Sequence, residues 1–196
     1  MYAPAVLLPL LLSTASALRI TSIKTSGTAC PSTAAESVTS AGTLSDLTVT
    51  LPAYDVSLDA SQGQNSSTNC ALMIAFDKGE VGKSLVLESV KVWSGLTLEA
   101  GGAATLFTSA FWSENPSNTI VARRETSSTP AYADNVSINS DLGVPSSCVE
   151  ESGNVGILNV NFRVLATKGV VTLGPETVGG KKQPATEHLG FKWVDC

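Results

Sequence analysis

The feature that most constrains the fold of this chain is an alternation of apolar and polar residues with a period of two. Its clearest instance is GILNVNFRVLA, residues 156–166, where the two kinds of side chain alternate from Leu158 to Val164. Successive residues of a strand point to opposite faces, so such a segment has one face in the core and one in water. Similar segments lie at 44–51, 70–76, 84–93, 103–112, 117–122, 169–173 and 188–195. Helical periodicity is hard to find, so the pattern predicts an all-β protein with little or no helix.

Turn-rich stretches separate these segments, most clearly at 59–69, 113–118 and 177–187. Several short strands divided by such breaks are typical of an antiparallel β-sandwich, and we expect one of Ig-like or jelly-roll-like form. No internal repeat and no long linker divides the chain. We therefore expect a single β-sandwich domain over residues 18–196.

The first seventeen residues, MYAPAVLLPLLLSTASA, have the features of a secretory signal peptide. The apolar run from Ala5 to Leu12 is shorter than the ~20 residues that a membrane span needs. It is followed by Ala15-Ser16-Ala17, the small-x-small pattern that signal peptidase cleaves. No later segment predicts a membrane anchor, and the tail lacks a lipid-anchor signal. We expect a signal peptide at 1–17 and a secreted protein, extracellular or associated with the cell wall.

The charge and the histidine content exclude several classes of function. The chain has 12 basic and 17 acidic residues, a net charge of −5, and no basic cluster. This balance argues against partners such as nucleic acid or an anionic membrane surface. His188 is the only histidine, and no close Cys or His spacing predicts a metal site or a cofactor. The sequence carries no signal for an oligomeric state.

The cysteines and two short motifs fit an oxidising compartment. The four cysteines, Cys30, Cys70, Cys148 and Cys196, predict two disulfides, which three pairings could form. None stands in a Cys-x-x-Cys pair, which argues against a redox dithiol. Asn65-Ser66-Ser67 and Asn135-Val136-Ser137 predict N-glycosylation of Asn65 and Asn135.

Several segments around the cysteines resemble a known family. They are GTACP at 27–31, TNCAL at 68–72, the run from Val90 to Trp112, LNVNFRV at 158–164 and the terminal FKWVDC. Together they are similar to the secreted fungal four-cysteine family known as domain of unknown function 4360. The resemblance implies a β-sandwich with disulfides and brings no established activity. By chain order we favour the pairs Cys30–Cys70 and Cys148–Cys196, because each is close in sequence and flanks one β segment.

Catalytic motifs are weak. A Ser-His-Asp site would have to use His188, and no Gly-x-Ser-x-Gly elbow is present. Glycosidases use two carboxylates without a recognisable motif, and here the acids that could serve are Asp55, Asp59, Glu99, Glu150 and Glu151. We predict no catalytic residue and keep a small secreted hydrolase with carboxylate chemistry as the alternative. Arg123-Arg124 is either a dibasic processing site or an exposed strand end.

The aromatic residues carry the one signal for binding. Phe111 and Trp112 are neighbours in an expected strand, so one ring should face the core and the other should face outward. An outward ring on a sheet is a usual platform for sugar rings or a partner protein, unless a loop covers it. We expect a non-catalytic protein that binds cell-wall polysaccharide or an extracellular protein. Trp112 is the first candidate residue, with Phe111 and Trp93 beside it.

Overall fold

The computed structural model describes residues 18–30, 39–51 and 54–196, so the expected signal peptide at 1–17 lies outside the described residues. The strands are β1 (Arg19–Ser26), β2 (Thr39–Thr43), β3 (Asp46–Leu51), β4 (Val56–Ala60), β5 (Ser66–Asp77), β6 (Lys83–Leu98), β7 (Ala103–Trp112), β8 (Ile120–Ser127), β9 (Tyr132–Pro145), β10 (Gly156–Gly174), β11 (Glu176–Val178), β12 (Lys181–Gln183) and β13 (Ala185–Asp195). The helical element in this part of the chain is a short 3-10 turn, η2 (Pro116–Asn118). The described residues contain no helix of the length and hydropathy needed to cross a membrane. The predicted all-β fold is confirmed.

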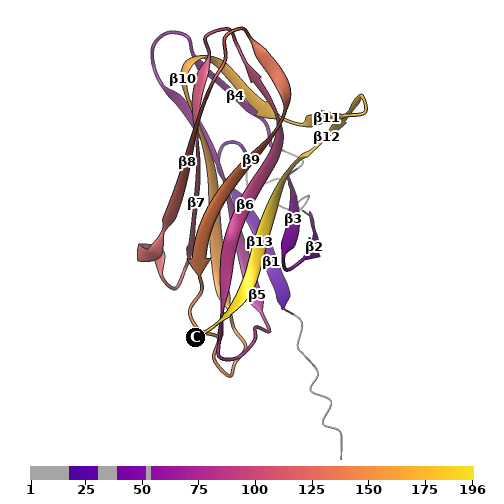
Figure 1. Ribbon diagram of the computed structural model, residues 1–196, viewed down its shortest axis with the longest axis vertical. Coiled ribbons are helices and arrows are strands. Elements are labelled where there is room, and N and C mark those ends of the chain that lie inside the picture. Colours follow the sequence, from indigo (N-terminus) through magenta and orange to yellow (C-terminus); the bar gives the residue numbers. More distant parts are fainter. Residues whose placement is uncertain (1–17, 31–38, 52–53) are drawn as a thin grey trace, which may run out of the picture.

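The strands form two antiparallel layers that run along the long axis of the molecule (Figure 1). Layer A has the order β1, β5, the first part of β10, β7 and β8. In layer B, β9 pairs with one edge of β6 along most of its length. The other edge of β6 pairs with β13 and then with the last part of β10. At the outer edges of this layer, β13 pairs with β3 and β3 pairs with β2, while the last part of β10 pairs with β4.

Strand β10 joins the two layers. Residues up to Lys168 pair within layer A, and residues from Gly169 onward pair within layer B. A bulge at Ala166/Lys168 and a positive φ of 61° at Gly169 mark the bend between the two parts. Gly169 also passes close to Gly102, because an added Cβ would lie 3.2 Å from the Gly102 Cα. The sequence predicted two strands, at 156–166 and 169–173, and the structure corrects this to one strand bent at a glycine.

The alternating apolar positions meet between the layers. Phe162 packs against Tyr54, and Phe76 packs against both Trp112 and Phe191. The largest fully buried apolar side chains are Trp112, Tyr54, Phe162, Leu72, Ile74, Leu85, Leu87, Leu98, Leu158, Leu173 and Leu189. Together they form one core, in agreement with a β-sandwich.

Two disulfides tie the sandwich together. Cys30 is bonded to Cys70, which joins the segment after β1 to β5, and Cys148 is bonded to Cys196 at the end of β13. These are the two pairs that chain order favoured. The dibasic pair Arg123-Arg124 lies inside β8, where it pairs with Phe107 and Leu106 of β7, and not at a strand end.

Candidate functional site

The structure overturns the first candidate for a binding aromatic. Trp112 is 1 % exposed, its ring packs on Phe76, and its indole N–H donates a hydrogen bond to the carbonyl of Val144 at 3.1 Å. The alternation of β7 therefore directs Trp112 into the core, where the indole N–H is satisfied. Phe111 lies on the outer side of the same strand and is half-buried. Neither ring forms an open platform.

Of the three candidate aromatic residues, Trp93 is the most exposed. It lies near the middle of β6 on the outer face of layer B and is 38 % exposed. Its neighbours on the adjacent strands are polar, because Trp93 pairs with Ser137 of β9 and with Thr186 of β13. Two residues earlier on β6, Lys91 pairs with Asn139 of β9 on one side and with His188 of β13 on the other. A single indole therefore stands among hydroxyl, amide, imidazole and ammonium groups.

His188 is held firmly beside the indole. Its Nδ1 lies 3.0 Å from Asp46 Oδ1 and 3.2 Å from Thr48 Oγ1, and its Nε2 lies 3.3 Å from Thr186 Oγ1. Because an ionised carboxylate only accepts hydrogen bonds, Nδ1 donates to Asp46. The imidazole and indole centroids are 6.2 Å apart and their planes are tilted by 54°. Three strands, β3, β6 and β13, thus fix the two rings relative to each other.

A hollow of about 360 Å³ opens beside these rings, and we call it the Trp93 hollow. It is lined by Ser45, Asp46, Ser89, Lys91, Trp93, His188 and Gly190. The small residues Ser89 and Gly190 face each other across β6 and β13, which leaves this space open. A Cβ added to Gly190 would lie 2.7 Å from Ser89 Oγ and 3.3 Å from the carbonyl oxygen of Ser45. Any side chain at position 190 would therefore enter the hollow.

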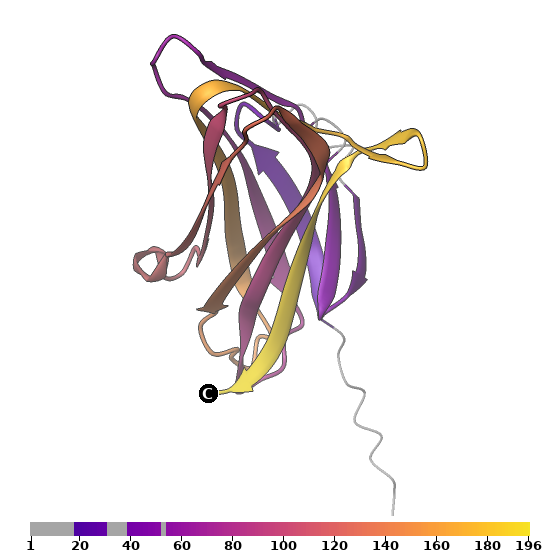
Figure 2. The same ribbon diagram turned by 45° about the horizontal axis from the view of Figure 1, so that its top comes forward.

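The hairpin β11–β12 bounds the Trp93 face at one end. It leaves layer B where β10 ends and β13 begins, next to Trp93, and it projects from the body of the sandwich (Figure 2). Asn135 of β9 holds its base, since the side-chain amide donates to the Thr177 carbonyl at 2.6 Å and accepts from the Thr177 amide at 2.9 Å. Gly95 of β6 pairs with Asn135 and lines the same hollow as Asn135 and Thr177.

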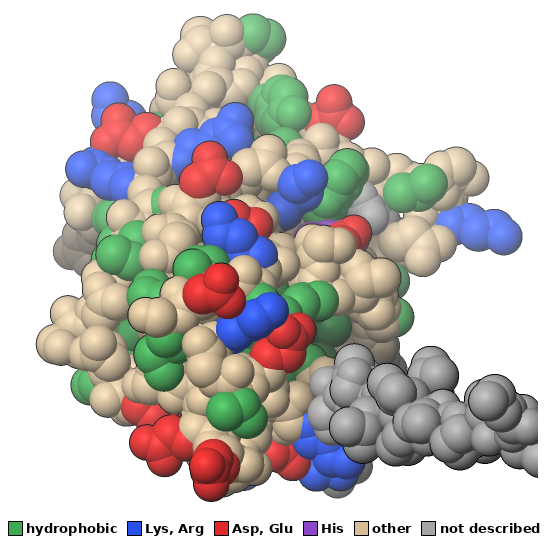
Figure 3. All heavy atoms as spheres, turned by 60° about the horizontal axis from the view of Figure 1, so that its bottom comes forward, with side chains coloured by type: hydrophobic (Ala, Val, Ile, Leu, Met, Phe, Trp, Pro, Cys, Tyr) green, Lys and Arg blue, Asp and Glu red, His purple; other side chains and the backbone are tan. Residues whose placement is uncertain are grey.

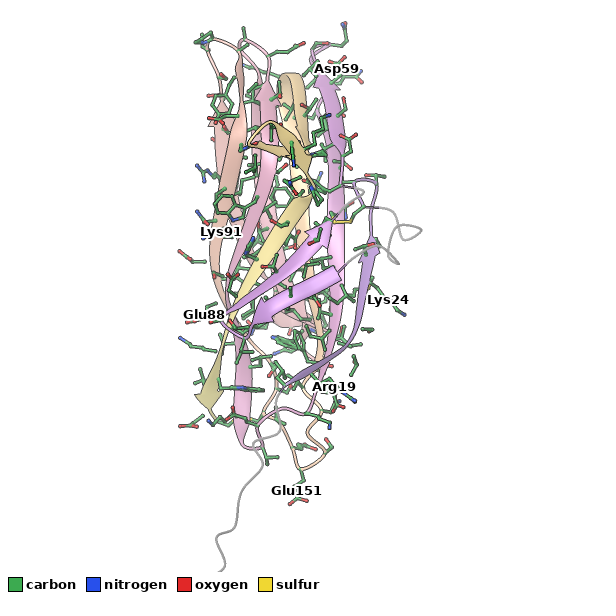
Figure 4. All side chains as sticks on the ribbon, turned by 90° about the vertical axis from the view of Figure 1, so that its right-hand side faces the viewer. Arg19, Lys24, Asp59, Glu88, Lys91 and Glu151 are labelled. Atoms are coloured by element: carbon green, nitrogen blue, oxygen red, sulfur yellow. A yellow bond between two sulfur atoms is a disulfide. The ribbon has the colours of Figure 1, made fainter. Side chains whose placement is uncertain are left out.

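A second hollow of about 430 Å³ lies at the base of the hairpin. Its lining includes Gly95, Thr97, Asn135, Thr177 and two carboxylates, Asp55 and Asp134. The other acids considered for catalysis are far from it or otherwise engaged. Asp59 and Glu151 lie at opposite ends of the long axis (Figure 4). Glu99 Oε2 accepts a hydrogen bond from the Val170 amide at 3.1 Å, and Glu150 lines a separate small hollow.

Among the described residues, the one carboxylic acid with a strongly raised pKa is inaccessible. Glu187 points into the core from β13 and is 1 % exposed, and burial raises its pKa to about 8. Burial and the neighbouring Glu187 also raise the pKa of Tyr54. Because Glu187 has almost no contact with solvent, it does not form a cleft acid of the kind that a glycosidase uses.

The two predicted glycosylation residues differ in their surroundings. Asn65 is exposed in the turn before β5. Asn135 lies inside β9, and both polar atoms of its side chain are bonded to the hairpin. N-glycosylation of either residue stays a prediction.

Sequence reasoning named Trp93 but missed the residues that surround it. The expected strand 84–93 contained both Lys91 and Trp93, and His188 began the expected strand 188–195, whereas Thr186 fell in an expected turn-rich stretch. What sequence reasoning lacked was the pairing of β6 with β13 and of β13 with β3, which brings Asp46, Lys91 and His188 together. The unusual small residue Gly190 within an otherwise regular strand was the available signal for the hollow.

Comparisons with known proteins give a family and distant structural likenesses. A family model described as "Domain of unknown function (DUF4360)" matches residues 16–196. No curated protein matches the chain. The solved structures with similar folds include the carbohydrate-binding module TmCBM61 in complex with β-1,4-galactotriose, with a TM-score of 0.25, 11% identity, and coverage of 90% of each chain. They also include a carbohydrate-binding module of the β-sandwich superfamily, with a TM-score of 0.26, 12% identity, and coverage of 88% of this chain and 57% of the other. A third is the enzymatically active domain of bacteriophage CBA120 tailspike protein 4, with a TM-score of 0.25, 9% identity, and coverage of 91% and 20%.

Proposed function

The chain belongs to the family named Domain of unknown function (DUF4360), and from this premise we propose that it is an extracellular protein that binds polysaccharide without cleaving it. The binding surface is the outer face of layer B around the Trp93 hollow. The observation that carries the proposal is the partly exposed indole of Trp93, set beside a polar hollow on a rigid sheet face.

The chemistry of this face complements a sugar ring. A pyranose has an apolar face of C–H bonds, which packs on an aromatic ring, and a rim of hydroxyl groups that donate and accept hydrogen bonds. Trp93 supplies the aromatic surface, and the hollow beside it offers Asp46, Lys91 and His188. Its volume of about 360 Å³ is within the range of ligand sites. Because hydrogen bonds to Asp46, Thr48 and Thr186 already hold the His188 ring, this ring needs little further ordering on binding.

Binding of the secreted, oxidised protein to soluble glycans and to cell-wall fractions tests the proposal. We expect Trp93→Ala to lower the affinity roughly tenfold or more, since a central aromatic contact contributes at least about 1.4 kcal/mol. The side chain points outward, so the melting temperature should change little. Gly190→Ala should weaken binding as well, because its methyl group enters the hollow.

Ile157→Ala is the matched control. Ile157 is 42 % exposed and lies on β10 within layer A, away from the Trp93 hollow. Its replacement removes similar apolar surface and should leave glycan binding unchanged. If Trp93→Ala bound every glycan as tightly as the wild type, the proposed surface would be wrong.

The same samples test the absence of cleavage. After long incubation with each glycan that binds, new reducing ends are measured. We expect none above the level of a protein-free sample. Release of reducing ends that disappeared in Asp55→Asn or Asp134→Asn would instead favour the hydrolase alternative, at the hollow that these two residues share.

A further inference from the structure

The charges around the Trp93 hollow are unevenly compensated. Asp46 is engaged by His188 at 3.0 Å, and Glu88 is engaged by Lys192 at 2.6 Å. None of the ion pairs between described residues includes Lys91, although Lys91 lines the hollow. Asp141 faces Ser89 from β9 but does not line the hollow. Lys91 is therefore the one lysine or arginine in the lining, and its ammonium group has no ion-pair partner within the described residues.

Lys91 is also placed where a ring bound on Trp93 would present its substituents. The two residues lie two positions apart on β6, so they share its outer face. The Lys91 Nζ atom is 6.0 Å from the centroid of the Trp93 ring. An ammonium at this distance is held weakly by the indole and stays available to an anionic group.

We propose that the Trp93 hollow selects acidic polysaccharides, with Lys91 pairing with the carboxylate of a uronic acid unit stacked on Trp93. This inference rests on the proposed function and adds the class of ligand. A uronic acid carries its carboxylate at the edge of the pyranose ring, so stacking on Trp93 and pairing with Lys91 can occur together. A charged hydrogen bond between ammonium and carboxylate is stronger than one between neutral groups.

Two lysines on the hairpin β11–β12 extend the preference for acidic polysaccharide to a longer polymer. Lys181 and Lys182 are exposed on β12, in the hairpin that leaves layer B beside Trp93. A polymer that continues from the hollow toward the hairpin would meet these two cations. The face of the molecule in Figure 3 mixes charges of both signs without a large patch of either. The selectivity therefore depends on these local lysines and not on the net charge of −5.

The test compares two polymers that share one backbone, polygalacturonate and its fully methyl-esterified form, by calorimetric titration of the full mature protein at low ionic strength. We expect the wild type to bind polygalacturonate about tenfold more tightly than the ester. The preference should shrink as salt is added, because the hollow is open to solvent. Lys91→Met should bind both polymers equally, at the affinity of the wild type for the ester. Lys91→Arg should keep the preference.

Lys24→Met is the matched control, since Lys24 lies on the opposite side of the sandwich from Lys91 (Figure 4). It removes the same charge and should leave the preference unchanged. Equal binding of both polymers by the wild type, or a preference that survives Lys91→Met, would overturn the acidic selectivity while the proposed function stands. A wild-type protein that binds neither these polymers nor any neutral glycan would overturn both.

Discussion

At the scale of single residues, Glu187 stands out as a carboxylic acid buried in the core. Its Oε2 atom and the Tyr54 hydroxyl are buried without a hydrogen-bond partner among the described residues. Burial raises the pKa of Glu187 to about 8, whereas an unfolded chain has a glutamate pKa of ~4.3. Between these values the folded protein holds a proton that the unfolded chain has released.

We therefore expect the free energy of unfolding to fall as the pH rises. A folded-state pKa above the unfolded one gives a stabilisation that is complete below about pH 4 and is lost progressively up to about pH 8. The slope is at most about 1.4 kcal/mol per pH unit. Urea unfolding at pH 5 and at pH 8 measures the difference, and the protein should be less stable at pH 8.

Glu187→Gln isolates the cause. The amide keeps the shape of the side chain but does not titrate, so the variant should lose most of the dependence between pH 5 and pH 8. Glu151→Gln, an exposed acid at one end of the molecule, should keep it (Figure 4). An unchanged pH dependence in Glu187→Gln would show that another group is responsible.

At the scale of elements, the strands were predictable where one face is buried and the other is wet. Segments 70–76 and 156–166 both lie within strands whose alternating apolar positions are buried. The short strands β2, β4, β11 and β12 were missed, as were the longer strands β1 and β9. Strand β1 is exposed along much of both faces, and the first half of β9 has no alternation. Their positions are set by pairing with β5 and β6, which is a tertiary effect.

The candidate site was less predictable than the strands. Alternation shows which residues share a face but not which face is outward, so Trp112 and Trp93 could not be told apart as core and surface residues. The packing of the two layers decides it, because Trp112 lies on the buried face of β7 and Trp93 on the outer face of β6. Residues far apart in the sequence meet only after the layers have formed.

The hairpin β11–β12 depends on one side chain for its position. Asn135→Ala removes both hydrogen bonds to Thr177, so we expect the Thr177 amide to exchange with solvent as quickly as an exposed loop. Strand β9 should keep its protection, because its ladder with β6 is unchanged. Hydrogen exchange followed by mass spectrometry, on protein made without glycosylation, measures both segments.

Asn139→Ala provides the comparison, since Asn139 lies on the same face of β9 and its side chain bonds to Ser137 and not to the hairpin. In this variant, the Thr177 amide should exchange with solvent as slowly as it does in the wild type. Retained protection of Thr177 in Asn135→Ala would mean that the short ladder between β11 and β12 holds the hairpin by itself.

At the scale of the whole molecule, the two disulfides act in different surroundings. Cys30 and Cys70 are 3 % and 0 % exposed and belong to the core, while Cys148 and Cys196 are exposed. The second bridge joins the end of β13 to the connection between β9 and β10, at the lower end of the sandwich in Figure 1. One bridge is thus protected by the fold, and the other is open to thiols in solution.

We expect dithiothreitol under native conditions to reduce Cys148–Cys196 and to leave Cys30–Cys70 intact, because exchange requires a thiolate to reach the sulfur atoms. Alkylation and peptide mapping identify which cysteines have reacted. The bridges close loops with sequence separations of 40 and 48 residues, so each stabilises the fold by about 4 kcal/mol in the chain-entropy model. Replacing Cys148 and Cys196 by Ser should therefore lower the free energy of unfolding by about that amount and leave the core bridge unreactive. Equal reaction of all four cysteines in native protein would show that the sandwich opens as one unit, before the exposed bridge is reduced.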